Sequence, residues 1–212
     1  MQIDVYSDIV CPWCRIGKSN LTKALELWAA QGGETAAVTY RAFQLDPTVP
    51  REGLPFAEAM ETKMGGQEGA LRAAQRVTEA GAAVGVTFRY DRITRLPNTK
   101  LAHRLVKLTP ERLQAETVEA LFRAYFEDGA DIARLETLEA LAAAIGPEAA
   151  DAASLLRTEE TAGEAQVDAD LQLAERLGVT GVPFFVFNNR FSLSGAYPAE
   201  QLAELLKKVA DA

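Results

Sequence analysis

Residues 2–14 read QIDVYSDIVCPWC. Ile3 and Val5 alternate with Asp4 and Tyr6, which is the period of a short strand with two different faces. A helix period starts directly after Cys11. Its apolar residues lie three and four positions apart, at Leu21, Ala24, Leu25 and Trp28. Two cysteines, Cys11 and Cys14, therefore lie where a predicted strand gives way to a predicted helix.

The rest of the chain contains further strand signals around a long helical region. A second strand is predicted at residues 38–43, and a loop with proline and glycine follows it to Pro55. Residues 56–177 are almost wholly helical in pattern, in segments separated by glycine and proline. The apolar run at residues 182–187 predicts a strand covered on both faces. A partner strand at residues 190–194 and a closing helix complete the chain.

This order, β-α-β, then helices, then β-β-α, indicates an α/β protein. Residues 1–50 and 178–212 are expected to form two halves of one α/β layer. They enclose an all-helical insertion domain, residues 51–177, whose last helix leads back into the layer. With 212 residues and 48% hydrophobic content, the chain can bury a core of this size.

Composition and charge limit the expected partners and compartment. The net charge is −8 and the pI is near 4.9, so no general electrostatic attraction to nucleic acid or to an anionic membrane is expected. No basic region precedes a hydrophobic stretch at the N-terminus, and no run of about 18 apolar residues occurs. We therefore expect a soluble, cytoplasmic protein. Cys11 and Cys14 are the only cysteines, which excludes a framework of structural disulfides.

The sequence Cys11-Pro12-Trp13-Cys14 has the position of a redox-active dithiol. Unpaired N–H groups and the macrodipole at a helix N-terminus stabilise an anion, which favours the thiolate of Cys11 as the attacking sulfur. Cys14 lies one turn further along, where it can close a disulfide with Cys11 and resolve a mixed disulfide. Pro12 fits the first helical position because the N–H that it lacks would be unpaired there.

Two alternatives give the cysteines no redox role. Half of a structural zinc site would need two more ligands, and the chain offers no further cysteine and a single histidine, His103. Two inert buried thiols have no reason to lie together at a strand-to-helix junction. No metal site is therefore expected.

A proline opens the apolar strand in the sequence Gly181-Val182-Pro183. Proline cannot donate a hydrogen bond to a sheet, so its place at the head of a central strand needs a reason. A cis Val182–Pro183 bond would turn the N–H and C=O of Val182 toward an incoming peptide. A trans proline at a strand start is the alternative.

Several motifs follow one another along the chain. They are SDIVCPWC at residues 7–14, IGK at 16–18, residues 41–47, LPNT at 96–99 with AHRL at 102–105, and GVTGVP at 178–183. This series resembles the DsbA-type thiol–disulfide oxidoreductases, and in particular their FrnE-like branch within the thioredoxin-fold superfamily. The resemblance implies a thioredoxin-like fold with a large all-helical insertion domain. It also implies Cys11 as nucleophile, Cys14 as its partner and Pro183 in cis beside the dithiol. The chain departs from its relatives at Arg15, where they usually carry an aromatic residue.

Other residues near the predicted dithiol are candidates for substrate contact or proton transfer. Pro12 and Trp13 are expected to form an apolar rim for substrate. Asp8 could relay a proton during resolution, or could cap the turn that enters the helix. His103 could tune the thiolate or contact substrate, because the corresponding helix of the family lies over the dithiol; an ordinary helix histidine is the alternative. Arg15 is expected at the surface, unless it stabilises the thiolate through space.

Three functions fit these residues. The leading one is a thiol–disulfide oxidoreductase, with disulfide isomerase activity as a variant, that acts on protein or small-molecule thiols and disulfides. The second is a glutathione-dependent isomerase or transferase resembling hydroxychromene carboxylate isomerase, although such relatives typically keep a single Ser or Cys at the first motif position. The third is a thioredoxin-like module that binds without catalysis. No cofactor is expected beyond the Cys11–Cys14 pair, with glutathione or a thioredoxin-type protein as redox partner.

Overall fold

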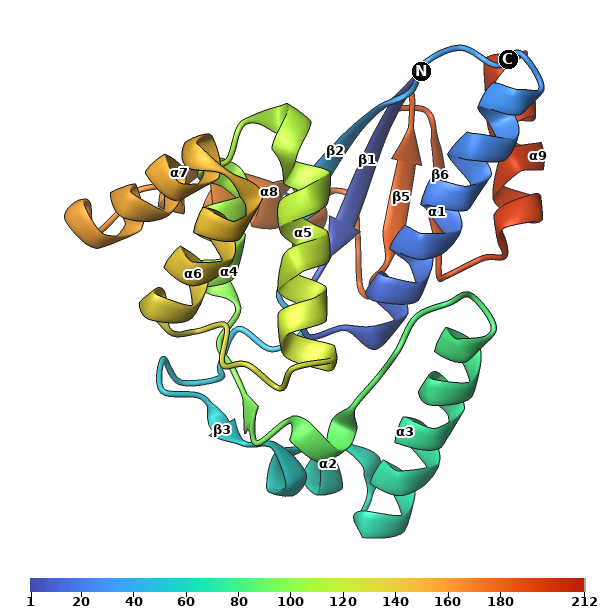
Figure 1. Ribbon diagram of the computed structural model, residues 1–212. Helices are drawn as coiled ribbons and strands as arrows, with labels where there is room; N and C mark the ends of the chain where they lie inside the picture. The colour runs from blue at the N-terminus through green and yellow to red at the C-terminus, as the bar shows by residue number, and fades with distance from the viewer. Residues whose placement is uncertain (212) are drawn as a thin grey trace.

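A computed structural model describes residues 1–211. Its main sheet has four strands in the order β2-β1-β5-β6 (Figure 1). The strands are β1 (Gln2–Ser7), β2 (Ala37–Ala42), β5 (Phe184–Phe187) and β6 (Phe191–Ser194). β1 pairs with β2 in parallel and with β5 in antiparallel fashion, and β6 pairs antiparallel to β5. The two ends of the chain therefore build one sheet together.

Helices cover both faces of this sheet. Helices α1 (Pro12–Ala30) and α9 (Ala199–Ala210) pack against each other on one face, and α8 (Glu164–Arg176) contacts β2 from the other (Figure 1). Alternate residues of β1 pack on opposite faces of the sheet. Ile3 and Val5 belong to the main apolar core, while Tyr6 packs in a smaller cluster with Ala174 of α8. β1 is thus held from both sides, which fixes the position of the segment that leads to the cysteines.

The remaining helices lie between β2 and β5 in the chain. They are α2 (Phe56–Met64), α3 (Gln67–Ala82), α4 (Lys100–Leu108), α5 (Glu111–Phe126), α6 (Leu135–Ile145) and α7 (Pro147–Thr158). Helices α4 to α7 pack on one another, and α5 also contacts β2. Helices α2 and α3 form a hairpin near the N-terminus of α1 (Figure 1). Gly65 and Gly66 make its turn with φ angles of 74° and 109°, a region that glycine enters without steric cost.

The thioredoxin-like α/β fold with a helical insertion is confirmed, with small differences at element ends. β2 begins one residue before the prediction. β5 begins at Phe184, two residues after the start of the predicted run, because Pro183 cannot donate to the sheet. The almost wholly helical prediction for residues 56–177 missed β4 (Arg95–Leu96), which pairs with β3 (Leu54–Pro55), and a 3-10 turn at Tyr90–Arg92. Strands of two residues are too short to show a period. The division at residues 51–177 stays a prediction.

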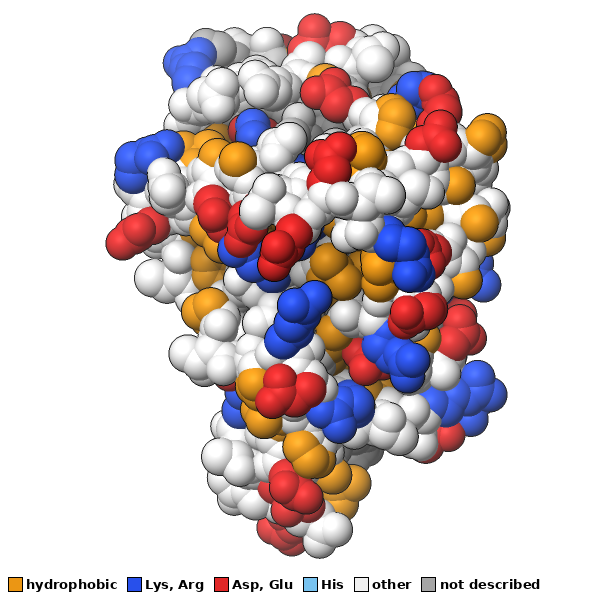
Figure 2. Space-filling view, turned by 90° about the vertical axis from the view of Figure 1, so that its left-hand side faces the viewer, with side chains coloured by type: hydrophobic (Ala, Val, Ile, Leu, Met, Phe, Trp, Pro, Cys, Tyr) orange, Lys and Arg blue, Asp and Glu red, His pale blue; other side chains and the backbone are white. Residues whose placement is uncertain are grey.

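The surface carries mixed charge. On the face shown in Figure 2, acidic and basic side chains alternate with apolar ones, and no continuous field of one sign covers it. Throughout residues 1–211, none of the helices combines the length and the apolar character that crossing a bilayer requires.

Candidate active site

Cys11 is the N-cap residue of α1. Its backbone is extended, with φ −88° and ψ 111°, and Pro12 takes the first helical position. The N–H of Cys14 donates to Cys11 Sγ over 3.4 Å, so that the sulfur holds the place that a serine or aspartate oxygen usually takes in a cap. The Cys11 sulfur therefore lies at the positive end of α1, where an anion is stabilised.

Cys14 lies behind Cys11 and is only 2% exposed. Burial raises the pKa of Cys14 well above its ordinary value, and the neighbouring Cys11 sulfur raises it further; hydrogen bonding by the backbone of Asp8 and the side chain of Ser7 acts in the opposite direction. Both cysteines are free thiols. Cys14 is consequently protonated at neutral pH.

The loop before β5 touches the dithiol. The Val182–Pro183 bond is cis, as the family resemblance implied. The Cys11 thiol donates to the carbonyl oxygen of Val182 over 3.5 Å. Pro183 packs against Gly17 of α1, where an added Cβ would come within 2.9 Å of the proline Cγ. The sequence offered a signal for this contact, since a glycine within a helical pattern indicates a close approach, but no role was assigned to Gly17.

Asp8 and His103 form a buried pair beside the dithiol. Asp8 Oδ1 lies 3.2 Å from His103 Nε2, and Asp8 Oδ2 accepts a hydrogen bond from the N–H of Leu45 over 2.8 Å. The prediction that the side chain of Asp8 caps the turn is wrong, because Cys11 is the N-cap of α1. Asp8 contacts Cys11 through its backbone carbonyl, which accepts a hydrogen bond from the Cys11 N–H over 3.0 Å. The carboxylate instead joins α4 to the loop after β2.

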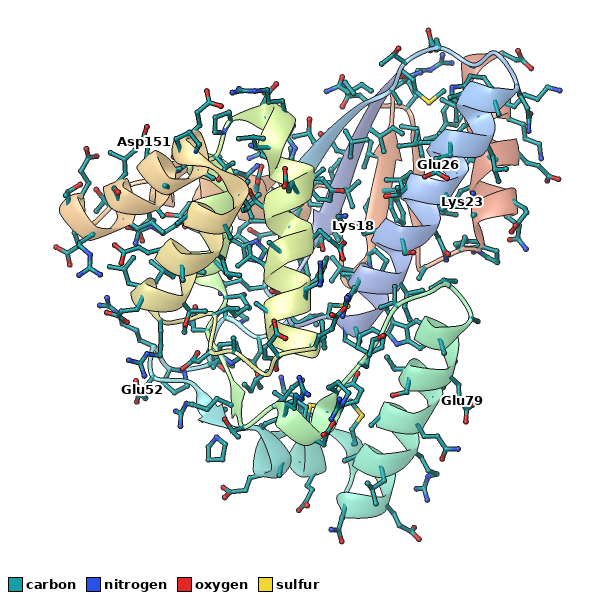
Figure 3. All side chains as sticks on the ribbon, viewed as in Figure 1. Lys18, Lys23, Glu26, Glu52, Glu79 and Asp151 are labelled. Carbon is teal, nitrogen blue, oxygen red and sulfur yellow. The ribbon has the colours of Figure 1, made fainter. Side chains whose placement is uncertain are left out.

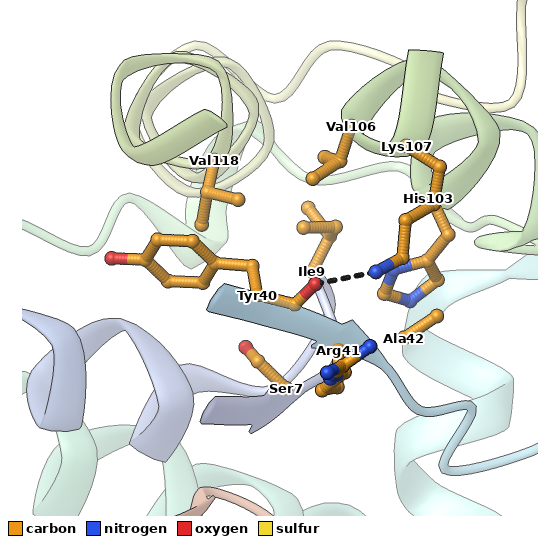
Figure 4. A pocket seen from close by; sticks show the side chains of 9 residues that line it. All are labelled: Ser7, Ile9, Tyr40, Arg41, Ala42, His103, Val106, Lys107 and Val118. Atoms are coloured by element: carbon orange, nitrogen blue, oxygen red, sulfur yellow. Dashed lines mark hydrogen bonds between the residues drawn. The ribbon is translucent and has the colours of Figure 1, made fainter. Parts of the chain in front are cut away.

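His103 lies away from the open side of the dithiol. It borders a cavity of about 10 Å³ between α4, α5 and β2, where Lys107 Nζ donates to the Tyr40 carbonyl over 2.8 Å (Figure 4). Such a volume holds one water molecule at most. His103 does not line the large pocket at Cys11, so the predicted direct contact with substrate does not fit its position.

A large pocket of about 750 Å³ opens beside Cys11. Of the predicted site residues, five line it together: Asp8, Cys11, Pro12, Trp13 and Val182. The Arg76 guanidinium lies 5.6 Å from the centre of the Trp13 ring. Helices α2 and α3 form the far wall, a contribution that the sequence analysis missed. A signal for it is present in the sequence, since Ala70, Ala74 and Val77 recur at helical spacing, and all three line the pocket.

Arg15 is buried, so its expected surface position is wrong. Its side chain is 3% exposed. Nη1 donates to the Thr87 carbonyl over 2.7 Å, and Nη2 forms an ion pair with Glu127 at the end of α5. One turn further along α1, Lys18 points toward α5 and binds Glu119 over 2.8 Å (Figure 3). The first turns of α1, which carry the dithiol, are thus fastened to the inserted helices.

Replacing Arg15 by alanine is expected to lower the free energy of unfolding by roughly 3 kcal/mol, because it leaves the half-buried Glu127 carboxylate without its main partner. The midpoint of urea unfolding, followed by circular dichroism, measures this loss. The exposed pair of Arg157 with Glu139, joined over 2.6 Å, provides the control. Arg157→Ala is expected to leave the midpoint almost unchanged. Equal midpoints for both variants would show that Arg15 does not fasten α1.

These observations define a class of protein. A Cys-X-X-Cys pair at the start of the first helix, faced by a cis proline that precedes a central strand, lies on a β-α-β frame completed by β-β-α after the inserted helices. This is the arrangement of the thioredoxin-fold proteins. The sequence model of the DSBA-like thioredoxin domain matches residues 2–207, and the chain belongs to this family.

Solved structures with the same fold include proteins of different reported activities. A probable DsbA oxidoreductase from Streptomyces coelicolor is 33% identical, with a TM-score of 0.88, over 100% of this chain and 90% of that one. The cytosolic disulfide reductase DsbM from Pseudomonas aeruginosa is 20% identical, with a TM-score of 0.70, over 100% of both chains. A 2-hydroxychromene-2-carboxylate isomerase is 17% identical, with a TM-score of 0.69, over 100% of this chain and 95% of that one. No curated protein matches the sequence significantly.

Proposed function

We propose that this protein is a thiol–disulfide oxidoreductase in which Cys11 is the nucleophile and Cys14 the resolving thiol. One observation carries the proposal: Cys11 Sγ lies at the N-terminus of α1 in the wall of a large pocket, while Cys14 is buried and protonated behind it. Two neighbouring thiols in such different surroundings are suited to successive steps of disulfide exchange.

The reduction of a substrate disulfide takes two steps. The Cys11 thiolate attacks one substrate sulfur, a Cys11–substrate disulfide forms, and the leaving thiolate takes up a proton. Cys14 then loses its proton and attacks Cys11 Sγ, which releases the second substrate thiol and leaves a Cys11–Cys14 disulfide. Two electrons pass from the protein dithiol to the substrate. A thiol partner, either glutathione or a thioredoxin-type protein, restores the dithiol, and no other cofactor takes part.

Neighbouring residues support these steps. Pro12, Trp13 and Val182 line the pocket and contact the substrate, and Pro183 holds the loop of Val182 against Cys11. We assign to Asp8 the relay of the proton that Cys14 loses, since Asp8 carries a buried carboxylate, lines the pocket and hydrogen-bonds Cys14 through its backbone. We assign His103 to the positioning of Asp8, since it contacts that carboxylate and does not line the pocket.

A glutathione-dependent isomerase is the second candidate, supported by the fold shared with 2-hydroxychromene-2-carboxylate isomerase. The presence of both Cys11 and Cys14 favours thiol–disulfide exchange over glutathione-dependent isomerisation. A binding module without catalysis is the third, and it gives no reason for the different surroundings of the two thiols. We further propose a cytoplasmic location, in line with the cytosolic relative DsbM. A reducing compartment keeps such a pair mostly reduced, so reduction or isomerisation is the favoured direction.

Equilibration in glutathione redox buffers tests the proposal. The expected result is one reversible Cys11–Cys14 disulfide, with a reduction potential between roughly −270 mV, as in thioredoxin, and roughly −120 mV, as in DsbA. A value near the lower limit indicates a reductase and one near the upper limit an oxidase. Mass measurement after acid quenching separates the two states, and Cys14→Ser is the control that cannot form the disulfide. If no reversible disulfide forms in the wild-type protein, the proposal fails.

A further inference from the structure

We propose that the pocket beside Cys11 selects low-molecular-weight disulfides that carry apolar, uncharged or cationic groups, and that glutathione disulfide is a slower substrate, whereas reduced glutathione still serves as a thiol that restores the dithiol. This inference rests on the proposed exchange at Cys11 and names the substrate class for it.

Access to Cys11 favours a small substrate. Cys11 is only 3% exposed and lies in the pocket wall, so a disulfide has to enter the pocket to bring its sulfur to Cys11 Sγ. The volume of about 750 Å³ lies within the range of roughly 300–1,000 Å³ typical of small-molecule sites. A disulfide on the surface of a folded protein could reach Cys11 Sγ only if the protein segment around it also entered the pocket.

The wall formed by α2 and α3 is apolar and lacks a packing partner. Helix α2 has no fully buried residue, although Phe56, Met60 and Met64 all line the pocket. Leu71 of α3 also lines it and is 64% exposed, the largest value among the exposed large hydrophobic side chains. An apolar ligand would remove this surface from water, and methionine side chains adapt to ligands of different shape.

The charges of the pocket oppose an anionic ligand. Four acidic residues line the pocket, Asp8, Asp46, Glu61 and Asp91. Asp8 contacts His103, Asp46 binds Lys63 and Asp91 binds Arg89. Lys63 is the one basic residue among the lining residues, and Asp46 already binds it over 2.9 Å. Within residues 1–211, no ion pair engages Glu61. Of the nearby cations, Arg89 binds Asp91 over 2.8 Å and Arg76 lies on the Trp13 ring.

Glutathione carries two carboxylates and one ammonium group. Among the residues that line the pocket, only Lys63 could bind the carboxylates of glutathione, which would break the Lys63–Asp46 pair and bring glutathione close to Glu61. Arg76, a nearby cation for which the described residues provide no carboxylate partner, lies over the Trp13 ring. Like-charge contact lowers both the rate of entry and the affinity. An uncharged aromatic or a cationic disulfide meets no such barrier, so the charge pattern and the apolar wall select the same kind of substrate.

Single-step trapping in the Cys14→Ser variant tests this selectivity. In that variant, one bond forms between Cys11 Sγ and a probe sulfur, the probe disulfide breaks, and one released thiol takes up the proton of Cys11. The probes are dithiodipyridine (uncharged, aromatic), dithiobis(nitrobenzoate) (anionic, aromatic), glutathione disulfide and insulin. Each rate constant is divided by that for N-acetylcysteine with the same probe, which removes the intrinsic reactivity of the probe.

The normalised rate constant for dithiodipyridine is expected to exceed those for both anionic probes by about tenfold or more. Glu61→Lys, added to Cys14→Ser, is expected to bring this ratio down severalfold by raising the rates of the anionic probes. Glu58→Lys is the matched control, since it changes the net charge equally from an exposed position of α2 outside the pocket wall, and it is expected to leave the ratio unchanged. A wild-type ratio near one, or equal effects of the two lysine variants, overturns the inference. A normalised rate for insulin above all small probes overturns it as well.

Binding without exchange separates this inference from the redox function. In the Cys11→Ser/Cys14→Ser variant, dithiodipyridine is expected to raise the Tm and glutathione disulfide to leave it unchanged. If dithiodipyridine causes no shift, the pocket assignment is wrong. Binding in this variant together with no accelerated reaction of any probe at Cys11 would overturn the redox function alone.

Discussion

Cys11→Ser is expected to abolish the reduction of disulfide substrates, lowering the rate by about a thousandfold or more to the uncatalysed background. A serine hydroxyl at the start of α1 stays protonated at neutral pH and cannot form the mixed disulfide that begins the exchange. Reduction of a small disulfide and of insulin, each coupled to a thiol reductant, measures the loss. A serine hydroxyl can take the N-cap position of the Cys11 sulfur, so the variant should stay folded.

Cys14→Ser is the matched control for this prediction. It keeps the attacking sulfur and removes only the resolving thiol, so a Cys11–substrate disulfide should accumulate in place of turnover, and its mass identifies it. Retained disulfide reduction in Cys11→Ser would disprove the assignment of the nucleophile. If glutathione-linked isomerisation survives in Cys11→Ser, the isomerase is the better description. Unaltered function in both variants would favour a binding module without catalysis.

At pH 7, iodoacetamide is expected to label the reduced, folded protein at Cys11 only, with Cys14 reacting at least about a hundredfold more slowly. Only a thiolate is alkylated, and the raised pKa of the buried Cys14 keeps its thiol protonated. Peptide mass mapping over a time course measures both rates. In guanidinium chloride, where burial is lost, the two rates should converge. Equal rates in the folded protein would contradict the different roles of the two thiols.

The same raised pKa predicts how stability depends on pH. Because the folded state holds the Cys14 proton more tightly than the unfolded state does, the resulting stabilisation is fully present below about pH 8.5, the pKa of a free cysteine. It is lost as the pH rises from there through the higher pKa of the folded state. Urea unfolding of the reduced protein should therefore show a falling midpoint above this pH. The oxidised protein, in which Cys14 cannot titrate, should show a smaller fall in the same window.

Much of the candidate site could be predicted because it is local in sequence. The start of α1 after Cys11, the fit of Pro12 at its first turn and the one-turn spacing to Cys14 depend on residues within a few positions of one another. The alternation of Ile3 and Val5 with Asp4 and Tyr6 predicted a short strand, which is β1. That both faces of β1 are covered was not predicted and is seen only in the structure. The cis Val182–Pro183 bond came from the family resemblance, because the residues alone left cis and trans open.

Contacts between residues far apart in the chain could not be predicted from the sequence. The pair Asp8–His103 joins residues 95 positions apart, and the ion pair Arg15–Glu127 joins residues 112 positions apart. Arg15 was placed at the surface because arginine is rarely buried without a partner, and its partner belongs to another element. The helical spacing of Ala70, Ala74 and Val77 indicates that one face of α3 is apolar, but it cannot indicate that this face borders an open pocket.

By itself, then, the sequence determined the strand-to-helix junction, the dithiol, and the helical insertion between the halves of the sheet. Only the tertiary structure decided that Cys11 is reached through an apolar, acid-lined pocket, that Asp8 is held by α4, and that Arg15 fastens α1 to α5. The physical reason is the range of the forces involved. Helix and strand periods and caps arise from neighbours along the chain, whereas burial, ion pairs and pocket shape arise only when remote segments pack together.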